Sequence, residues 1–595
     1  MVGSHTWTHP NIAEVPPEEA RIELSATQRL FETLTTRSMR LFRPPFFGDA
    51  EPSTPREVGP LLLAQEQGYL TAGLRIDPDD WQKPDAKLIV SRTLERLADT
   101  GPHQGQVVLL HDSGGDRSRT VEALPTLIDQ LRAHGYTLVT VDQLAGMTRA
   151  QALPPASRTS LELLLDRIGF GFFHGLEAAL EWLFITAIIL GVARVFMLGS
   201  LALVHRAKIE ARTPPLLFPD DGPIVSVLIP CFNEEKVIVA SVKRVLASRW
   251  PGLQVIVLDD GSKDKTASLV RDAFHEEPRV TLMCFENGGK ARALNRGLEH
   301  AKGEIIVALD ADTLFPSETI AMLARWFADP KVGAVAGNAI VGNRVNLITR
   351  WQALEYVTAQ NLERRALAAL GAVTVVPGAV GAWRKSALIA LGGYPPDTLA
   401  EDQDLTLAVQ RAGWRVEFDP EARAYTEAPD TVAGLLKQRY RWSFGTLQCL
   451  WKHRDGLFNP KRPVLGFVAL PQIWLFQIFL TVVAPLVDLA VVWSLISSIF
   501  GMVSHPMEWS ADDTLRPLFY WAAFIFLDLS AGALGMAMER RAPWRDLVWL
   551  PAQRFGYRQL MYYVVLKSID SAVRGARVGW GRLERRGNVK VAGTN

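Results

Sequence analysis

The residues best suited to chemistry are acidic ones that follow short apolar runs. Asp259-Asp260-Gly261-Ser262 and Asp310-Ala311-Asp312 each stand at such a point. Carboxylates at strand ends can hold a divalent cation on a diphosphate, or accept hydrogen bonds from a ribose or base. Either group alone also fits the plain role of Asp and Gly in ending a strand. Glu401-Asp402 and Gln438-Arg439-Tyr440-Arg441-Trp442 follow in order, and together the four groups favour the chemical interpretation.

A second set of polar residues lies within residues 1–150. His5 and His9 flank Thr6-Trp7-Thr8, a spacing that can present two imidazoles to one zinc ion, although such a pair is more often structural. Three further segments follow in the chain: Arg43-Pro44-Pro45-Phe46, Asp77-Pro78-Asp79-Asp80-Trp81 and Leu109-Leu110-His111-Asp112.

The acidic groups lie in a region, residues 223–460, where β-branched runs alternate with helical patterns. We expect buried parallel strands at Ser226–Ile229, Gln254–Leu258, Val280–Cys284 and Ile305–Leu309. Helices are expected near 234–248, 264–275, 290–301 and 316–328. This βαβ succession predicts an α/β, doubly wound sheet that binds its ligand at the carboxyl ends of the strands. No G-x-G-x-x-G follows the first strand, which argues against a dinucleotide site.

The composition bounds the class of protein. The chain has 595 residues, 64 Lys and Arg against 63 Asp and Glu, and 48% hydrophobic residues. This charge balance argues against a nucleic-acid partner, and the many large apolar side chains exclude intrinsic disorder. The three cysteines show no metal-ligand spacing and make a disulfide framework improbable. We therefore expect three or four folded units, some of them joined to membrane segments.

The strongest apolar run, Trp182–Val204, predicts a transmembrane helix. It holds one charge, Arg194, and as a helix would be about 34 Å long against a hydrocarbon core of about 30 Å. Arg194 could snorkel to the interface or line a polar path. Acidic residues dominate before the run and Arg206, Lys208 and Arg212 follow it, which places residues 1–165 outside and the chain after 205 in the cytoplasm. The first residues show no signal peptide.

Further apolar blocks lie near the C-terminal end. Val464–Val503, interrupted by Pro471 and Pro485, could be two spans or one span plus an interfacial helix. Pro517–Ala537 is another candidate, and Leu547–Leu566 is weaker because it carries two arginines. The connector 539–546 and the tail after Lys567 are both basic, and they cannot both be cytoplasmic if Leu547–Leu566 crosses once.

Residues 223–595 resemble the family 2 glycosyltransferases, specifically the processive membrane synthases of chitin, hyaluronan and cellulose. The resemblance rests on six motifs: Ile229-Pro230-Cys231-Phe232-Asn233-Glu234-Glu235, Asp259–Ser262, Gly288-Gly289-Lys290-Ala291, Asp310–Asp312, Glu401-Asp402 and Gln438–Trp442. One departure is Ala400, where many relatives have Thr; it removes a hydroxyl but no catalytic group.

The resemblance implies a role for each motif. On the donor side, Asp259 and Asp260 would contact the uridine, Lys290 would face the diphosphate, and Asp310 with Asp312 would hold Mg²⁺ or Mn²⁺. Asp402 would be the general base that deprotonates the acceptor hydroxyl as UDP leaves from the opposite face, which inverts the anomeric centre. Glu401 would belong to the substrate site, and Gln438, Arg441 and Trp442 would form the acceptor platform. The Gln438–Trp442 segment also fits an interfacial helix anchored by Arg and Trp.

Residues 1–150 resemble the polysaccharide deacetylases, which are zinc-dependent enzymes that remove N-acetyl groups. The resemblance implies that His5 and His9 are Zn²⁺ ligands, that His111 is the general acid, and that Arg43 lies in the substrate groove beside Asp77–Trp81. The family's opening strand, Thr-Phe-Asp-Asp-Gly-Pro, would precede Met1, and it supplies the third zinc ligand and the general base. We therefore expect a partial, (β/α) barrel-like segment that is incomplete and inactive.

The sequence as a whole predicts a multi-pass membrane enzyme that polymerises and extrudes a β-linked glycan from a UDP-sugar. The fused deacetylase-like segment favours UDP-N-acetylglucosamine. Two alternatives are a transferase that adds one sugar to a polyprenyl phosphate and a non-catalytic export or scaffold subunit. The expected partners are the UDP-sugar, the growing glycan and the lipid bilayer. The expected domains are the deacetylase-like segment 1–150, a linker 151–181, a span 182–204, the transferase 205–460, and membrane or interfacial helices with a basic tail over 461–595.

Overall fold

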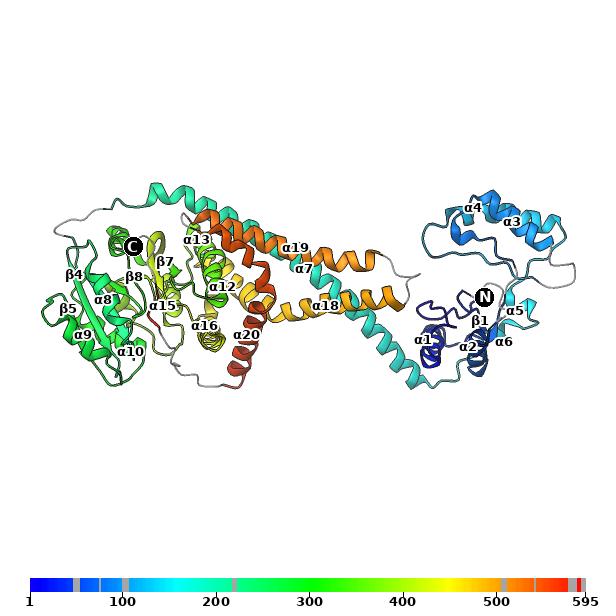
Figure 1. Ribbon diagram of the computed structural model, residues 1–595, viewed down its shortest axis with the longest axis horizontal. Coiled ribbons are helices and arrows are strands. Elements are labelled where there is room, and N and C mark those ends of the chain that lie inside the picture. Colours follow the sequence, from blue (N-terminus) through cyan, green and yellow to red (C-terminus); the bar gives the residue numbers. More distant parts are fainter. Residues whose placement is uncertain are drawn as a thin grey trace. The chain divides into compact units, whose positions relative to one another are not determined.

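The structure is a computed structural model, and it describes residues 1–46, 54–73, 76–98, 106–216, 222–504, 511–539, 542–575 and 586–589. The chain divides into two compact units, Met1–Glu181 and Trp182–Asn595. The boundary between them falls inside one long helix, α7 (Ser160–Arg212), which is drawn in cyan and teal in Figure 1. Each unit has its own apolar core.

The first unit is mainly helical. Its only named strands in the described residues, β1 (Leu41–Phe42) and β2 (Leu70–Thr71), pair in parallel. One core lies around Ile12, Leu24 and Phe42, and a second around Ile76, Ile89 and Leu127. The helices are α1 (Pro17–Thr35), α2 (Pro55–Glu66), α3 (Ala86–Ala98), α4 (Ser118–Ala133), α5 (Val141–Leu144) and α6 (Arg149–Ala152), with the short turn η1 (Asp80–Gln82).

The second unit is built on a seven-stranded sheet in the order β5-β4-β3-β6-β8-β7-β9. The four predicted strands are present and parallel, as expected. The short strand β8 lies between β6 and β7 and runs antiparallel to both, so the sheet is mixed. The bounds are β3 (Val225–Cys231), β4 (Leu253–Asp259), β5 (Val280–Cys284), β6 (Ile305–Ala308), β7 (Val332–Val341), β8 (Gly381–Arg384) and β9 (Arg415–Thr426).

Helices cover both faces of this sheet, which explains why its strands are apolar throughout. In β3, Val227 and Ile229 pack on one face while Leu228 packs on the other. The first face carries α8 (Ile238–Leu246), α9 (Thr266–Phe274) and α11 (Thr319–Ala324). The second carries α10 (Lys290–His300), α14 (Lys385–Ala390) and α15 (Glu401–Arg411). The α/β fold class predicted from the sequence is confirmed.

A layer of helices connects the sheet to the apolar helices. It contains α12 (Leu347–Glu355), the π-helical segment η3 (Tyr356–Asn361), α13 (Leu362–Ala369), α16 (Val432–Lys452) and α20 (Tyr557–Val573). The Tyr440 hydroxyl of α16 donates to Ser571 Oγ of α20 at 2.8 Å. The acceptor motif predicted from the sequence therefore lies on a helix of this layer.

Three helical stretches in the described residues are long and apolar enough to cross a membrane: Ser160–Ile209, Leu465–Val503 and Thr514–Met538. The second is one continuous helical stretch. Its π-helical segments η5 (Leu465–Ala469) and η6 (Ile473–Phe479) accommodate Pro471, which lies between them, and α18 (Leu480–Ser504) follows. The third is α19 (Ala511–Met538). Gly199 of α7 admits the side chain of Leu534 of α19, since a Cβ there would lie 2.6 Å from it.

Residues 547–566 form no candidate span. They are divided among the 3₁₀ turns η7 (Trp544–Trp549) and η8 (Pro551–Arg554) and the start of α20. The two arginines that weakened the prediction, Arg554 and Arg558, form ion pairs with Asp528 of α19. A segment that does not cross would leave the basic connector and the basic tail on the same side.

Candidate active site

The turn after β4 is held by Asp260. Both of its carboxylate oxygens accept backbone N–H groups at 2.8 Å, one from Gly288 and one from Gly289. Asp259, the last residue of β4, is buried and accepts the backbone N–H of Ser262 at 3.3 Å. In this arrangement the Asp259-Asp260 pair fixes the loop that leads directly into Lys290.

Lys290 is the first residue of α10, and its amino group links two of the predicted acidic motifs. Nζ lies 2.8 Å from Asp310 Oδ1 and 2.7 Å from Glu401 Oε1. Burial alone would lower the pKa of Lys290, but the charges of Asp310, Glu401 and Asp402 outweigh it and raise that pKa above its usual value. The side chain is therefore a fixed positive charge at the carboxyl edge of the sheet.

Gly378 closes the same cluster from another segment. A Cβ at this residue would lie 2.8 Å from Lys290 Nζ, and its backbone N–H donates to Asp402 Oδ2 at 3.2 Å. A larger residue here would displace the Lys290 amino group from its present position. The sequence analysis missed Gly378, and nothing local to that glycine could have revealed it.

Asp402 lies in the first turn of α15, beside Glu401. Burial, followed by the charge of Glu401, raises the pKa of Asp402 to about 6. Lys290 opposes this shift. A carboxylate with a pKa near 6 is ionised at neutral pH and is a stronger base than an ordinary aspartate. Arg364, another residue missed from the sequence, lies in the field of Asp402, and burial lowers its own pKa to about 10.

Asp310 and Asp312 follow β6 in a short turn. Asp312 is buried, and its Oδ1 accepts the Thr313 hydroxyl at 3.3 Å. No group of three or more His, Cys, Asp or Glu side chains in the described residues could hold a metal ion by itself. Mg²⁺ in nucleotide sites is held by one or two carboxylates together with phosphate oxygens. Two neighbouring aspartates fit that role when the nucleotide supplies the other ligands.

The acceptor motif on α16 contains several buried polar atoms without partners. Within the part of the chain that the structure describes, Gln438 Oε1 accepts no hydrogen bond, and Arg439 Nε and Nη1 and Ser443 Oγ make none. Arg439 Nη2 donates to Glu355 at 2.7 Å, and its guanidinium lies 4.3 Å from the centre of the Trp442 ring. Buried polar atoms in proteins usually have a partner, which can be protein, water or a ligand, so these atoms offer hydrogen-bonding capacity beside Trp442. Trp442 itself is partly exposed.

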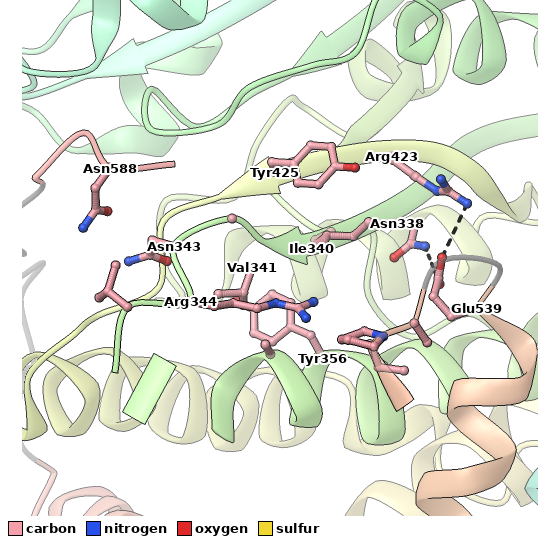
Figure 2. A pocket seen from close by; sticks show the side chains of 17 residues that line it. Asn338, Ile340, Val341, Asn343, Arg344, Tyr356, Arg423, Tyr425, Glu539 and Asn588 are labelled. Carbon is pink, nitrogen blue, oxygen red and sulfur yellow. Dashed lines mark hydrogen bonds and ion pairs between the residues drawn. The ribbon is translucent and has the colours of Figure 1, made fainter. Parts of the chain in front are cut away.

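A cavity of about 400 Å³ lies where β7 and β9 end, above η3 (Figure 2). Tyr425 in its wall pairs with Leu314, two residues after Asp312, through backbone hydrogen bonds of 2.8 and 3.0 Å. Tyr356 in the opposite wall contacts Trp442, with ring centres 6.4 Å apart. Asn338 and Arg423 reach Glu539, which follows α19. The cavity therefore lies beside both the predicted metal loop and the predicted acceptor platform.

In the first unit the structure brings the predicted deacetylase-like residues together. The rings of His5 and His9 have centres 4.8 Å apart, and His5 lies in the electrostatic field of His111. The His111 ring donates to Asp80 Oδ1 at 2.7 Å, and Asp80 is fully buried. Burial would raise the pKa of Asp80, but hydrogen bonds from the backbone and ring of His111 outweigh it and lower that pKa. Asp80 thus orients His111.

The expected zinc pair is not arranged for a metal. His5 Nδ1 is bonded to the Arg43 carbonyl at 2.7 Å, and His5 Nε2 lies 2.7 Å from Arg43 Nη2. Burial, the largest effect, lowers the pKa of His5 to about 4, so the ring is neutral and Nε2 accepts from the guanidinium. Because both nitrogens are engaged, these residues as arranged do not fit Zn²⁺, and we derive no hydrolytic step for them.

A part of each unit matches a known protein family. Residues 222–445 match the family model described as glycosyltransferase like family 2, and residues 1–57 match the model described as polysaccharide deacetylase. Poly-beta-1,6-N-acetyl-D-glucosamine synthase of Staphylococcus aureus (strain COL) is 30% identical over 261 residues, or 43% of this chain and 63% of the relative. The enzyme of the same name from Staphylococcus epidermidis is 29% identical over 275 residues, or 44% of this chain and 66% of the relative.

The chain thus spans just under two thirds of the length of these curated relatives. A solved mannosyltransferase from Pyrobaculum calidifontis, in complex with GDP-Man and Mn²⁺, is 25% identical with a TM-score of 0.42. That match covers 57% of this chain and 98% of the mannosyltransferase.

Proposed function

We propose that the chain, whose residues 222–445 match the family 2 glycosyltransferases, is a membrane-embedded, inverting transferase that polymerises N-acetylglucosamine from UDP-N-acetylglucosamine. The observation that carries the proposal is the cluster of Lys290, Asp310, Glu401 and Asp402 at the carboxyl edge of the sheet. It joins a fixed cation, a metal-binding carboxylate and a tuned base within one site. Carboxylates with raised pKa values in such clusters are typical of functional sites, which supports the role of Asp402 as a base.

On the donor side, Asp259 and Asp260 form the wall that receives the uridine, and Lys290 supplies positive charge to the diphosphate. Asp310 and Asp312 would hold Mg²⁺ or Mn²⁺. That ion, when bound, neutralises charge on the leaving diphosphate. Lys290 would then exchange part of its pairing with Asp310 and Glu401 for the phosphate oxygens.

On the acceptor side, Asp402 takes the proton from the attacking hydroxyl. Asp402 Oδ2 accepts the Gly378 N–H at 3.2 Å and Oδ1 accepts the Gln403 N–H at 2.8 Å. Both oxygens are therefore oriented, and each keeps a second lone pair that can receive the proton. Attack from the face opposite the UDP leaving group needs a single base and yields an inverted, β-linked product. Trp442 offers an aromatic face to the terminal sugar, and Gln438 Oε1 accepts one of its hydroxyls.

Polymer formation, and N-acetylglucosamine as its unit, are supported by the names of the similar proteins, which are poly-beta-1,6-N-acetyl-D-glucosamine synthases. The partly exposed Trp442 also supports repeated addition, because an aromatic platform can retain the growing end between steps.

A three-span arrangement accounts for the chain's charges. Span Ser160–Ile209 would leave the residues before it outside and the transferase in the cytoplasm, since Arg206, Lys208 and Arg212 stand at its end. The two later spans would cross out and back, which returns the basic connector and tail to the cytoplasmic side. Extrusion of the product would then proceed along these helices.

The test is a donor screen with the full chain in lipid nanodiscs, using radiolabelled UDP-N-acetylglucosamine, UDP-glucose and UDP-galactose in Mg²⁺ or Mn²⁺. We expect long products from UDP-N-acetylglucosamine alone, released as acid-stable polymer. A single sugar on an added polyprenyl phosphate would contradict polymerisation. No transfer from any donor, with normal folding, would instead indicate a scaffold subunit.

A further inference from the structure

Two helices carry the base and the acceptor platform, and a buried polar cluster ties them together. α15 begins with Glu401-Asp402, and α16 contains Gln438–Trp442. Asp404, two residues after the base, is 1% exposed and accepts three hydrogen bonds. They come from Lys452 Nζ at 2.8 Å, His453 Nε2 at 2.7 Å and the Thr398 hydroxyl at 2.9 Å. The end of α16 is therefore fastened to the first turn of α15.

His453 contacts α15 at both of its ends. Arg411, in the last turn, donates to His453 Nδ1 at 2.9 Å, and the His453 Nε2–H donates to Asp404. One imidazole thus bridges the first and last turns of the helix that carries the base. Arg411 is also paired with Asp455 beyond α16.

Asp402 and Asp404 have opposite electrostatic environments. Burial would raise the pKa of Asp404, but hydrogen bonds from His453 and Lys452 outweigh it and lower that pKa. The pKa of Asp402 is raised instead. Carboxylates whose environments push their pKa values apart have different roles, and only Asp402 is suited to accept a proton near neutral pH.

The helices also approach closely beside the base. A Cβ on Gly445 of α16 would lie 2.7 Å from the Cβ of Ala400 and 2.8 Å from its backbone nitrogen. Gln448 Oε1 accepts the Leu399 N–H at 2.9 Å, and the Thr446 hydroxyl donates to Gln403 at 2.8 Å. Ala400, the departure from related sequences, is thus a small residue that leaves room for α16.

We propose that Asp404 and His453 are positioning residues that set the distance between the base on α15 and the acceptor platform on α16. The proposal rests on the proposed transferase function and extends it to residues that touch neither donor nor acceptor. Small displacements of reacting groups cost rate without removing binding, and about 1 Å can cost 10²-fold.

The test compares Asp404→Asn with Asp397→Asn in the full chain in nanodiscs. Asp397 is a matched control, because it accepts from the same Lys452 at 2.9 Å but is largely exposed and does not contact His453. We expect Asp404→Asn to lower kcat by about 10²-fold, with KM for UDP-N-acetylglucosamine within twofold and the acidic limb of the pH profile unmoved. Asp397→Asn should behave as the unaltered protein.

Two further variants keep the test informative if Asp404→Asn folds poorly. His453→Gln retains a donor toward Asp404 and should be milder than His453→Leu, while Gly445→Ala should lower kcat and leave KM for the donor unchanged. Unaltered kcat in both Asp404→Asn and Gly445→Ala would overturn the proposal, as would an equal loss of donor affinity and melting temperature. An inactive unaltered protein would instead count against the proposed function itself.

Discussion

Lys290 Nζ lies 2.8 Å from an oxygen of Asp310, so the cation expected at the diphosphate and a carboxylate expected at the metal are already paired. The same amino group reaches Glu401, next to the base. Donor, metal and base residues from three separate segments therefore share one electrostatic site. Replacing Lys290 should therefore change the pKa of Asp402.

Replacing Lys290 by Gln should move the pH dependence of the reaction. The base works only when ionised, so kcat/KM should fall as the pH drops through the pKa of Asp402, which is about 6. Lys290 lowers that pKa, and its loss should shift the acidic limb to higher pH while the plateau rate also falls. Lys385→Gln is the control, because its amino group donates to the Ala301 carbonyl, at 2.6 Å, and lies outside the cluster around Asp402. An unmoved limb would disconnect Lys290 from the base.

Asp312→Ala should weaken metal-dependent donor binding. The aspartate supplies one of two protein carboxylates, and without it the ion would depend on the nucleotide and Asp310 alone. Isothermal titration with UDP in Mg²⁺ and in Mn²⁺ should show the loss, with little difference from the unaltered protein in EDTA. Activity of the unaltered protein that survives EDTA would contradict the metal assignment.

Trp442→Ala should shorten the product. The Arg439 guanidinium packs against the Trp442 ring, and the ring also contacts Tyr356, so we expect it to form a rigid surface for the terminal sugar. Trp451→Ala is a matched control on the same helix, with a more exposed ring. Gel sizing of radiolabelled polymer should show short chains for Trp442→Ala only. Equal chain lengths in both variants would favour single addition.

The motif residues and the parallel strands could be read from the sequence because both signals are local. β3 and β4 are continuous Val, Ile and Leu runs, and their acidic ends follow directly. β7 was not predicted from the sequence, because it contains Gly333 and Gly337 and glycine is rare in strands. These glycines leave room for the side chains of Trp414 and Val380, which belong to distant segments. Gly378 and Asp404 were also missed, because their roles depend on residues that only the folded chain brings near.

The environment of Arg194 also depends on tertiary structure, and the sequence alone left open whether this residue snorkels to the interface or lines a polar path. It pairs with Glu363 of α13 at 3.0 Å, and Glu363 also accepts from Gln472 and Gln477 of the second span. This cluster links the first and second candidate spans to α13, in the helical layer between the sheet and the apolar helices.

Arg194→Ala and Glu363→Gln should therefore be energetically coupled. Their double-mutant cycle in detergent should give a coupling on the order of 0.6 kcal/mol, the usual size for polar contacts between membrane helices. Arg296→Ala with Glu363→Gln is the uncoupled reference pair, since Arg296 lies over Phe285 beside the sheet. Additive effects in the Arg194 pair would show that Arg194 acts independently of Glu363.

The central claim, that Asp402 is the base of a polymerising transferase, is tested most directly by Asp402→Asn in nanodiscs with UDP-N-acetylglucosamine. The amide keeps the shape of the side chain and cannot take a proton. We predict that polymer formation falls by about 10²–10⁴-fold while the Kd for UDP stays within twofold of the unaltered protein. Polymer made at a near-normal rate by Asp402→Asn would contradict the account.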